Sequence, residues 1–143
     1  AAIKARYEAV TQKMAAAKEK PTVFYEIDGT DPTKPWTVGP QSFIDTMLTL
    51  AGGQNIGAAL KDPFAQISWE ELFAQIPAVI LLGDAAYGVT VESLAQRPGW
   101  SSLSAIKNKQ VFTFDDNLIS RPGPRLIDGL EQMAKLIHPE LFK

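Results

Sequence analysis

Pro77-Ala78-Val79-Ile80-Leu81-Leu82-Gly83 is the stretch that decides the fold class. Its five consecutive apolar residues, 78–82, predict a strand buried on both faces, as in the interior of a parallel sheet. The loop 83–88 follows directly, so it would lie at the carboxyl end of that strand. Open α/β sheets bind their ligands at that end, which makes Tyr87 in this loop a candidate ligand contact.

Two further strands are predicted, one before and one after this run. Residues 22–27 and 110–114 are rich in β-branched and aromatic side chains, as strands are. The segments 28–35 and 54–64 are expected to be irregular. Periodic apolar patterns predict helices over residues 1–20, 43–51, 69–76, 91–96, 100–106 and 125–138. Because strands and helices alternate, the predicted fold class is α/β, with three layers and a mainly parallel central sheet flanked by helices.

Length and composition suit one globular domain with its own core. The chain has 143 residues, of which 45% are hydrophobic and 21% charged, and its net charge is −2. This charge argues against a basic face for nucleic acid, and the lack of cysteine excludes disulfides, thiolate zinc sites and a cysteine nucleophile. No apolar run reaches the roughly 18 residues of a membrane span, and no signal peptide is visible. Because the chain opens with Ala1 and not Met, we expect it to be a fragment or a processed product.

The predicted helix 1–20 carries one apolar stripe at spacings of three and four residues, formed by Ile3, Tyr7, Val10, Met14 and Ala17. Pro21 ends this helix, because the residue before a proline resists helical conformation. We expect an ordinary packing helix. At 1.5 Å per residue it would be about 30 Å long, enough to extend beyond a small domain.

Ser68-Trp69-Glu70-Glu71 has the pattern of a helix start. Ser68 and Glu71 match a capping box, in which each side chain accepts a hydrogen bond from the backbone N–H of the other residue. That role occupies Glu71 and leaves Glu70 pointing outward from the first turn. Taken alone, the residues favour stabilisation of the helix dipole as the role of Glu70, worth roughly 0.3–1 kcal/mol at an exposed site. A docking charge for a partner is the alternative.

Motifs of catalysis and metal binding are absent from the sequence. It contains no G-x-S-x-G, no G-x-x-x-x-G-K-[ST] and no G-x-G-x-x-G. The single histidine, His138, ends the last predicted helix, where a histidine complements the helix dipole. Metal sites need clustered His, Cys or carboxylates, and no such spacing occurs. Asp115 and Asp116 could act as paired carboxylates, although adjacent acids after a strand usually serve turns and caps.

The remaining functional candidates are aromatic and charged residues on predicted loops. Aromatic platforms with a few placed polar groups form small-molecule sites, and the residues of this kind are Trp36, Phe64, Tyr87, Asp116 and Arg121. The alternative for Trp36 is a lid over the core, and for Phe64 burial within it. Arg121 and Arg125 flank a Pro-Gly-Pro turn and add positive charge to a helix start that is already positive. This charge is answered either by a ligand or by the nearby acids Asp115, Asp116 and Asp128.

Six motifs then occur in order along residues 21–142. They are Gly39-Pro40-Gln41-Ser42-Phe43-Ile44, Leu50-Ala51-Gly52-Gly53-Gln54-Asn55-Ile56, Ile67-Ser68-Trp69-Glu70-Glu71-Leu72, Pro77-Ala78-Val79-Ile80-Leu81-Leu82, the run 97–108 that begins Arg97-Pro98-Gly99-Trp100, and Ser120-Arg121-Pro122-Gly123-Pro124-Arg125. Together they resemble the carboxyl-terminal lobe of the periplasmic binding proteins that serve cobalamin, iron-siderophore and haem ABC importers. The cobalamin branch looks closest. The resemblance implies two lobes joined by one long backbone helix, with the ligand held between them.

Under this resemblance, residues 1–20 correspond to the carboxyl-terminal part of the inter-lobe helix and residues 21–143 to one lobe. The other lobe lies outside this chain. Half of the ligand site and one docking surface would therefore be missing, and this lobe alone would bind ligand poorly. The implied location is periplasmic or otherwise extracytoplasmic, and a lipid anchor would belong to the missing amino-terminal part.

The resemblance also assigns roles to residues. In the family, one glutamate on each lobe docks into arginines of the membrane permease, and Glu70 falls at that position, which reverses the preference for a purely structural role. The ligand would contact Trp36, Phe64, Asp116 and Arg121. Asp116 is preferred over Asp115, in a loop whose length varies among family members. The residue spacing alone, apart from the resemblance, favours a structural role for Arg125, because it could pair with Asp128 three residues further along the helix.

Two functions from different classes follow. The first is a solute-binding lobe of an ABC importer, which presents a corrinoid, a ferric siderophore or haem to the permease, performs no chemistry and has no cofactor of its own. The alternative is a small α/β enzyme that acts on an anionic substrate through Asp115, Asp116 and Arg121. An enzyme would keep a complete pocket and turn over alone, whereas a lobe would present an open concave face.

Overall fold

A computed structural model describes residues 2–17, 20–114 and 125–139. Its centre is a six-stranded sheet in the order β4-β2-β1-β5-β6, in which β3 also pairs with β1. The strands are β1 Thr22–Asp28, β2 Trp36–Val38, β3 Gln54–Asn55, β4 Phe64–Gln66, β5 Val79–Leu82 and β6 Val111–Thr113. The pairs β1–β3, β1–β5 and β5–β6 are parallel, whereas β2 is antiparallel to both β1 and β4. The predicted α/β class with a mainly parallel sheet is therefore confirmed.

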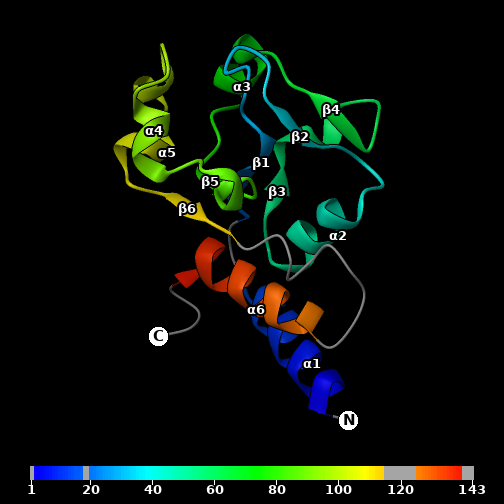
Figure 1. Cartoon of the computed structure of the whole chain (residues 1–143). Coiled ribbons are helices and arrows are strands. Elements are labelled where there is room, and N and C mark those ends of the chain that lie inside the picture. Colours follow the sequence, from blue (N-terminus) through cyan, green and yellow to red (C-terminus); the bar gives the residue numbers. More distant parts are fainter. Residues whose placement is uncertain (1, 18–19, 115–124, 140–143) are drawn as a thin grey trace.

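Helices cover both faces of the sheet (Figure 1). They are α1 Ala2–Ala15, α2 Phe43–Leu50, α3 Trp69–Gln75, α4 Val91–Ala95, α5 Ser104–Lys107 and α6 Arg125–Ile137, together with the 3-10 turns η1 Ile56–Ala59, η2 Ala85–Tyr87 and η3 Trp100–Ser102. None of these described helices is long and apolar enough to cross a membrane.

The core consists of two apolar clusters, one on each face of the sheet. Val79 and Leu81 of β5 belong to the cluster that includes buried residues of α1, α2 and α6. Ile80 and Leu82, the alternate residues of the same strand, belong to the cluster that includes buried residues of α3, α4 and η3. Successive side chains of a strand point to opposite faces, so a strand between two helical layers must be apolar throughout. The predicted doubly buried strand is therefore confirmed for residues 79–82, whereas Ala78 is exposed and lies outside β5.

Three short strands were not predicted. Trp36 begins β2 and Phe64 begins β4, so both residues lie in an antiparallel ribbon where loops were expected, and β3 lies within the segment 54–64. These strands have only two or three residues, too few for an alternating pattern to be recognised.

The first helix is shorter than predicted. It ends at Ala15, five residues before Lys20, because the backbone there tightens. Ala16 and Ala17 donate their N–H groups to Lys13 and Met14, the three-residue spacing typical of a final helical turn. The prediction over residues 1–20 was therefore too long.

Helix α2 begins and ends at the residues that the sequence indicates. Ser42 Oγ accepts a hydrogen bond from Asp45 N at 3.0 Å, which caps the first turn. At the other end Gly52 has a φ of +85°, and Gly53 N donates to Leu48 O at 2.9 Å. This positive φ favours glycine, which has no Cβ to clash in the left-handed region.

The parallel arrangement brings three strand ends to one edge of the sheet. β1 pairs with β5 and β5 with β6 in parallel register, so Asp28, Leu82 and Thr113 end their strands on the same side. Trp36 joins this edge because it pairs with Asp28 across the β1–β2 ladder. We call this side the carboxyl edge.

Candidate functional site

A cavity of about 390 Å³ opens at the carboxyl edge. Its wall comes from the end of β1 with the loop after it, and from the loop after β5. The lining residues are Ile27, Asp28, Gly29, Thr30, Asp84, Tyr87 and Val89. Tyr87, predicted as a ligand contact, is 81% exposed at this cavity. Its ring is therefore available to a ligand, and no packing role competes for it.

Trp36 and Phe64 lie on one face of the β2–β4 ribbon. Trp36 pairs with Gln66 and Val38 with Phe64, and residues two apart on a strand share a face. The two aromatic rings are thus diagonal neighbours, an arrangement within reach of aromatic side chains. They are 41% and 57% exposed, respectively. This exposure contradicts burial of Phe64 in the core and leaves both rings available as an aromatic platform.

The charged residues predicted for the ligand side cannot be placed. Asp115, Asp116 and Arg121 lie outside the described residues, so their roles remain predictions. Arg125 begins α6, and the structure does not describe its side chain. Asp128, predicted as the partner of Arg125, pairs with Arg6 of α1 at 2.5 Å.

A buried charge cluster lies beneath the cavity, and sequence reasoning missed it. Glu26 of β1 is fully buried, and Arg97 donates to both of its carboxylate oxygens, at 2.6 and 2.8 Å. Gly29 packs directly on this pair, because a Cβ there would collide with Arg97 Nη2 and Glu26 Oε1. A buried carboxylate needs such a partner, since removing a charge from water without one is costly. The sequence did contain a signal for this cluster, because Glu26 is a charged residue within the otherwise mainly apolar strand predicted over residues 22–27.

Asp84 adds a second carboxyl group to this cluster. It is 3% exposed, and its Oδ2 accepts a hydrogen bond from Gly29 N at 3.1 Å. Burial, together with the neighbouring carboxylate of Glu26, raises the pKa of Asp84 to about 8. Asp84 is therefore neutral at pH 7.

The pKa of Asp28, on the cavity wall, is shifted in the opposite direction. Hydrogen bonds from the side chain and backbone of Thr30 lower the pKa of Asp28, so it stays ionised.

Arg97 also links the cavity side to helix α3. Its guanidinium lies 4.5 Å from the centroid of the Trp100 ring, which stacks on Trp69 at 5.4 Å between centroids. Trp69 is the first residue of α3 and precedes Glu70. A cation over an aromatic ring is attracted by the negative face of the ring. The position of α3 is thus fixed by contacts that continue to the carboxyl edge.

Glu70 is exposed in the first turn of α3, as predicted. Ser68 Oγ accepts a hydrogen bond from Glu71 N at 3.2 Å, which is the serine half of the predicted capping box. The Glu71 carboxylate instead accepts a hydrogen bond from Gln75 Nε2 at 2.8 Å. A complete capping box occurs at Thr90 and Ser93 of α4.

His138 is a structural residue. Its ring is buried, and Nε2 lies 2.8 Å from Gly52 O, so it joins the end of α6 to the end of α2. The sequence interpretation placed it correctly at a helix end but did not foresee this contact. A carbonyl at a helix terminus has no partner within the helix, and a side chain can supply one.

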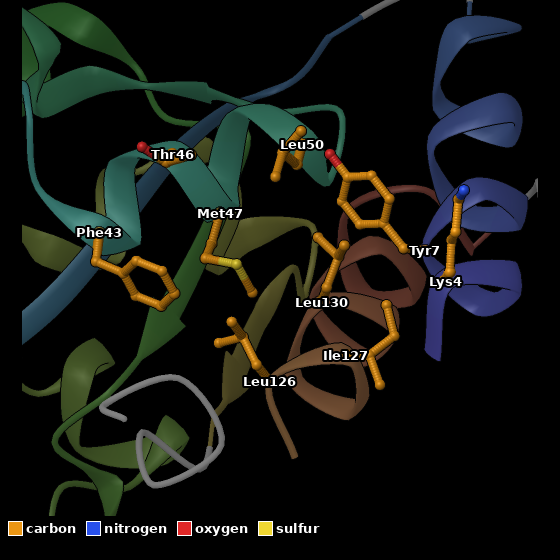
Figure 2. Close-up of a pocket in the computed structure, with 9 residues that line it drawn as sticks. All are labelled: Lys4, Tyr7, Phe43, Thr46, Met47, Leu50, Leu126, Ile127 and Leu130. Carbon is orange, nitrogen blue, oxygen red and sulfur yellow. The ribbon is translucent and has the colours of Figure 1, made fainter. Parts of the chain in front are cut away.

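A second, apolar cavity lies between α1, α2 and α6 (Figure 2). It measures about 380 Å³, and Met47, Leu126 and Leu130 point toward the space between the helices. Tyr7 of α1 and Phe43 of α2 stand at its sides and are partly exposed. Its lining is almost entirely hydrocarbon, which suits packing and not chemistry.

The described residues bring a cavity and two exposed aromatic side chains to the carboxyl edge. Within the described ranges, no group of three or more His, Asp or Glu side chains could hold a metal ion. The carboxyl edge combines a cavity, exposed aromatic rings and a few fixed polar groups. Such a combination is typical of small-molecule binding sites.

Comparisons with known proteins agree with this geometry. The family model described as "Periplasmic binding protein" matches residues 1–118. An uncharacterised ABC transporter substrate-binding lipoprotein of Bacillus subtilis is 34% identical, over 92% of this chain and 40% of its own length. A protein of Halobacterium salinarum named cobalamin-binding protein is 30% identical, over 83% of this chain and 32% of its own length.

A solved structure gives the same picture of the fold. The periplasmic haem-binding protein of Roseiflexus sp. RS-1 superposes with a TM-score of 0.81 at 24% identity, covering 97% of this chain and 54% of that protein. The chain thus spans 40% or less of the length of these curated relatives and about half of this structure.

Proposed function

The chain belongs to the periplasmic binding protein family, and from this premise we propose that it is the carboxyl-terminal lobe of a solute-binding protein that delivers a metal chelate to an ABC importer. Residues 1–20 would be part of the helix between the lobes, and residues 21–143 the lobe itself. The chain matches less than half of the length of its curated relatives, which supports this division.

One observation carries the proposal that the carboxyl edge is the ligand side. The exposed side chains of Trp36 and Phe64 lie on the same face of the β2–β4 ribbon, and Trp36 pairs with Asp28 of the adjacent cavity. Exposed aromatic rings suit a flat, conjugated ligand. A corrinoid, a ferric siderophore and haem are the candidate ligands, and one relative is named as a cobalamin-binding protein. Asp116 and Arg121 are proposed to complete this half of the site.

The proposed protein binds and delivers its ligand without chemical change. The enzyme alternative depended on Asp115, Asp116 and Arg121, which lie outside the described residues, and no observation on the described residues favours it. An extracytoplasmic location follows from the proposed role, and a lipid anchor would come from the preceding part of the protein. The partners are then the other lobe, the ligand and the membrane permease.

Glu70 is proposed to dock this lobe onto the permease. The side chain is exposed, Glu71 beside it is engaged by Gln75, and α3 is fixed by the Trp69–Trp100 stack. In the full two-lobed protein, we expect Glu70→Arg to weaken binding to the nanodisc-embedded permease by at least about tenfold, because an attraction becomes a repulsion. Surface plasmon resonance without added ligand measures this directly.

Glu92→Arg is the matched control for that measurement. Glu92 stands two residues after the N-cap Thr90 of α4, just as Glu70 stands two residues after the N-cap Ser68 of α3. Both reversals remove the same favourable interaction with a helix dipole. Equal permease affinity for Glu70→Arg and the unchanged protein would rule out docking through Glu70.

The ligand class is tested separately, by titrating the two-lobed protein with cyanocobalamin, haemin and ferrichrome.

A further inference from the structure

Three ionisable side chains lie together beneath the cavity at the carboxyl edge, and their charges do not balance. Glu26 of β1 is fully buried, and Asp84, two residues after the end of β5, is 3% exposed. Arg97 is the basic side chain that faces both carboxyl groups. If both carboxyl groups were ionised, one negative charge would stay uncompensated in a buried site, which is costly.

The hydrogen bonds of Asp84 indicate where a proton removes this excess charge. Asp84 Oδ2 accepts from Gly29 N at 3.1 Å, and the side chains of Asp84 and Glu26 are hydrogen-bonded to each other. An ionised carboxylate only accepts hydrogen bonds, so a bond between two carboxyl groups requires a proton on one of them. Arg97 donates to both oxygens of Glu26, an arrangement that suits a carboxylate. The proton therefore belongs to Asp84 Oδ1, a buried oxygen without a conventional donor among the described residues.

The surroundings of Asp84 favour this protonated form. The titratable and charged side chains that face it or its loop are Glu26 and Asp28 of β1, Tyr25 of β1 behind Gly83, Tyr87 of the same loop, and Arg97 after α4. The described residues 111–114, in and after β6, add no charged side chain. Burial and the neighbouring Glu26 raise the pKa of Asp84 to about 8, against a smaller opposing effect of Arg97.

This contact also fixes the turn that carries Tyr87. Asp84 O accepts from Tyr87 N at 3.0 Å at the start of η2, so the two residues belong to one tight turn. The side chain of Asp84 joins this turn to β1 through Glu26 and to the following loop through Gly29. Loss of its proton would place two carboxylates against each other, and like charges in contact repel. The turn would then move away from β1 and take the ring of Tyr87 with it.

We propose that Asp84 is a positioning residue whose proton ties the turn 84–87 to β1, and that loss of this proton releases the turn and widens the cavity at the carboxyl edge. In this step the O–H bond at Asp84 Oδ1 breaks, the proton passes to water or a buffer base, and a carboxylate remains. The inference goes beyond the proposed function, because it concerns a pH-dependent shape of the chain itself. Only its consequence for a transported ligand rests on that function.

Carbon-13 NMR of the labelled chain between pH 6 and 9.5 tests the tie with nuclei that do not exchange with water. We expect the Asp84 carboxyl carbon to titrate with a midpoint near pH 8. Over the same range, NOEs should weaken between the methyl groups of Ala85 and Val89 and the apolar cluster on which both residues pack. A carboxyl signal of Asp84 that does not titrate in this range overturns the proposal. Unchanged NOEs across the titration overturn it as well.

Asp84→Asn and Asp28→Asn form a matched pair for this test. An asparagine at position 84 can accept from Gly29 N and donate to Glu26, so it keeps the tie without a titratable proton. We expect its methyl NOEs to persist to pH 9.5. Asp28→Asn removes a carboxyl group from the same cavity wall but outside the tie, and it should keep the transition. A transition that survives in Asp84→Asn, or is lost in Asp28→Asn, contradicts the assignment to Asp84.

These measurements separate the tie from the transport role. They involve neither the permease nor a ligand, so a turn that stays in place above pH 8 refutes the tie alone. Failure of the two-lobed protein to bind cyanocobalamin, haemin and ferrichrome refutes the proposed ligand class, whatever the turn does.

Discussion

Arg97 joins the buried carboxylate of Glu26 to the aromatic stack at helix α3. It neutralises the buried Glu26, and it stacks on Trp100, which in turn stacks on Trp69 of α3. Removing one partner of a buried ion pair leaves an uncompensated charge, which is far more destabilising than loss of a surface pair. Arg97 therefore fixes the geometry of both the cavity wall and the helix that carries Glu70.

Asp84 gives the stability of the fold a pH dependence at neutral pH. Its pKa is raised from 3.8 to about 8, so between these values the folded chain holds a proton that the unfolded chain releases. The free energy of unfolding therefore falls as pH rises from about 4 to 8, by at most about 1.4 kcal/mol per pH unit, and this contribution is flat above pH 8. Asp84→Asn cannot titrate, and we expect a flatter profile for it.

Urea unfolding at pH 5, 6, 7 and 8.5 measures this difference. Working at pH 5 and above keeps Asp28 and Asp31 ionised, because hydrogen bonds from neighbouring threonines lower the pKa of each carboxyl group. Groups common to both proteins cancel in the comparison. Parallel profiles for Asp84→Asn and the unchanged chain would mean that Asp84 is ionised in the fold.

At the residue scale, the sequence identified chemistry that is local. It placed Ser42 and Ser68 at helix starts, Glu70 on an exposed first turn and Tyr87 on an exposed loop, because each depends on neighbours in the chain. The Glu26–Arg97 pair joins residues 71 positions apart. No local pattern links them, and only the folded topology brings an arginine after α4 under β1.

At the element scale, the end of α2 is a junction that tolerates little change. Gly52 has a positive φ, and its neighbours are packed against it. A Cβ there would lie 2.7 Å from two ring atoms of His138 and from Met14 Sδ. The backbone carbonyl oxygen of Gly52 also lies 2.8 Å from His138 Nε2, within hydrogen-bond distance. One residue thus joins α1, α2 and α6.

Gly52→Ala and Gly88→Ala separate backbone strain from collision. Both glycines have positive φ, +85° and +99°, but a Cβ at Gly88 meets nothing within 4 Å. We expect Gly88→Ala to lower the free energy of unfolding by about 1–2 kcal/mol through backbone strain. Gly52→Ala should lower it by about 2–4 kcal/mol, because overpacking adds to the strain. If urea unfolding shows the same decrease in the free energy of unfolding for both variants, the side chains around Gly52 must move enough to accommodate the added Cβ.

Elements were predictable where their apolar pattern is long. β1, β5 and the helices were placed within a few residues, apart from the overlong first helix. β2 and β4 were missed because a three-residue strand has no measurable periodicity, and the pairing that defines them, such as Trp36 with Gln66, is made across the chain. Trp36 and Phe64 were consequently predicted as two separate loop residues and not as neighbours on one ribbon.

At the scale of the whole molecule, α1 belongs to the core of the lobe. Val10 and Met14 are buried in the cluster that α2 and α6 share, and Arg6 binds Asp128 and Glu131 of α6. The division into residues 1–20 and 21–143 remains a proposal about the longer protein. Whichever way it is resolved, one face of this sheet needs α1 to cover it.

Deletion of residues 1–16 tests how far the lobe depends on this helix. Burial of a Val or Met side chain contributes about 1.5–3 kcal/mol, so the loss of Val10 and Met14 should lower the free energy of unfolding by about 3–6 kcal/mol. Arg6→Ala is the control. It removes the partly exposed ion pairs alone and should have only a small effect. Unchanged urea unfolding after the deletion would show that α1 is an appendage.

The packing of α1 on α6 has a consequence for the order in which the chain folds during synthesis. Arg6 and Glu131 are 125 residues apart, so α1 leaves the ribosome long before the helix to which it binds. Closing so long a loop carries an entropic cost that local contacts do not, and it slows folding. Until then the apolar stripe of α1 stays uncovered on the nascent chain. Exposed apolar surface on a nascent chain binds chaperones and promotes aggregation. We therefore expect the yield of folded lobe to depend on the speed of translation and on the supply of chaperones.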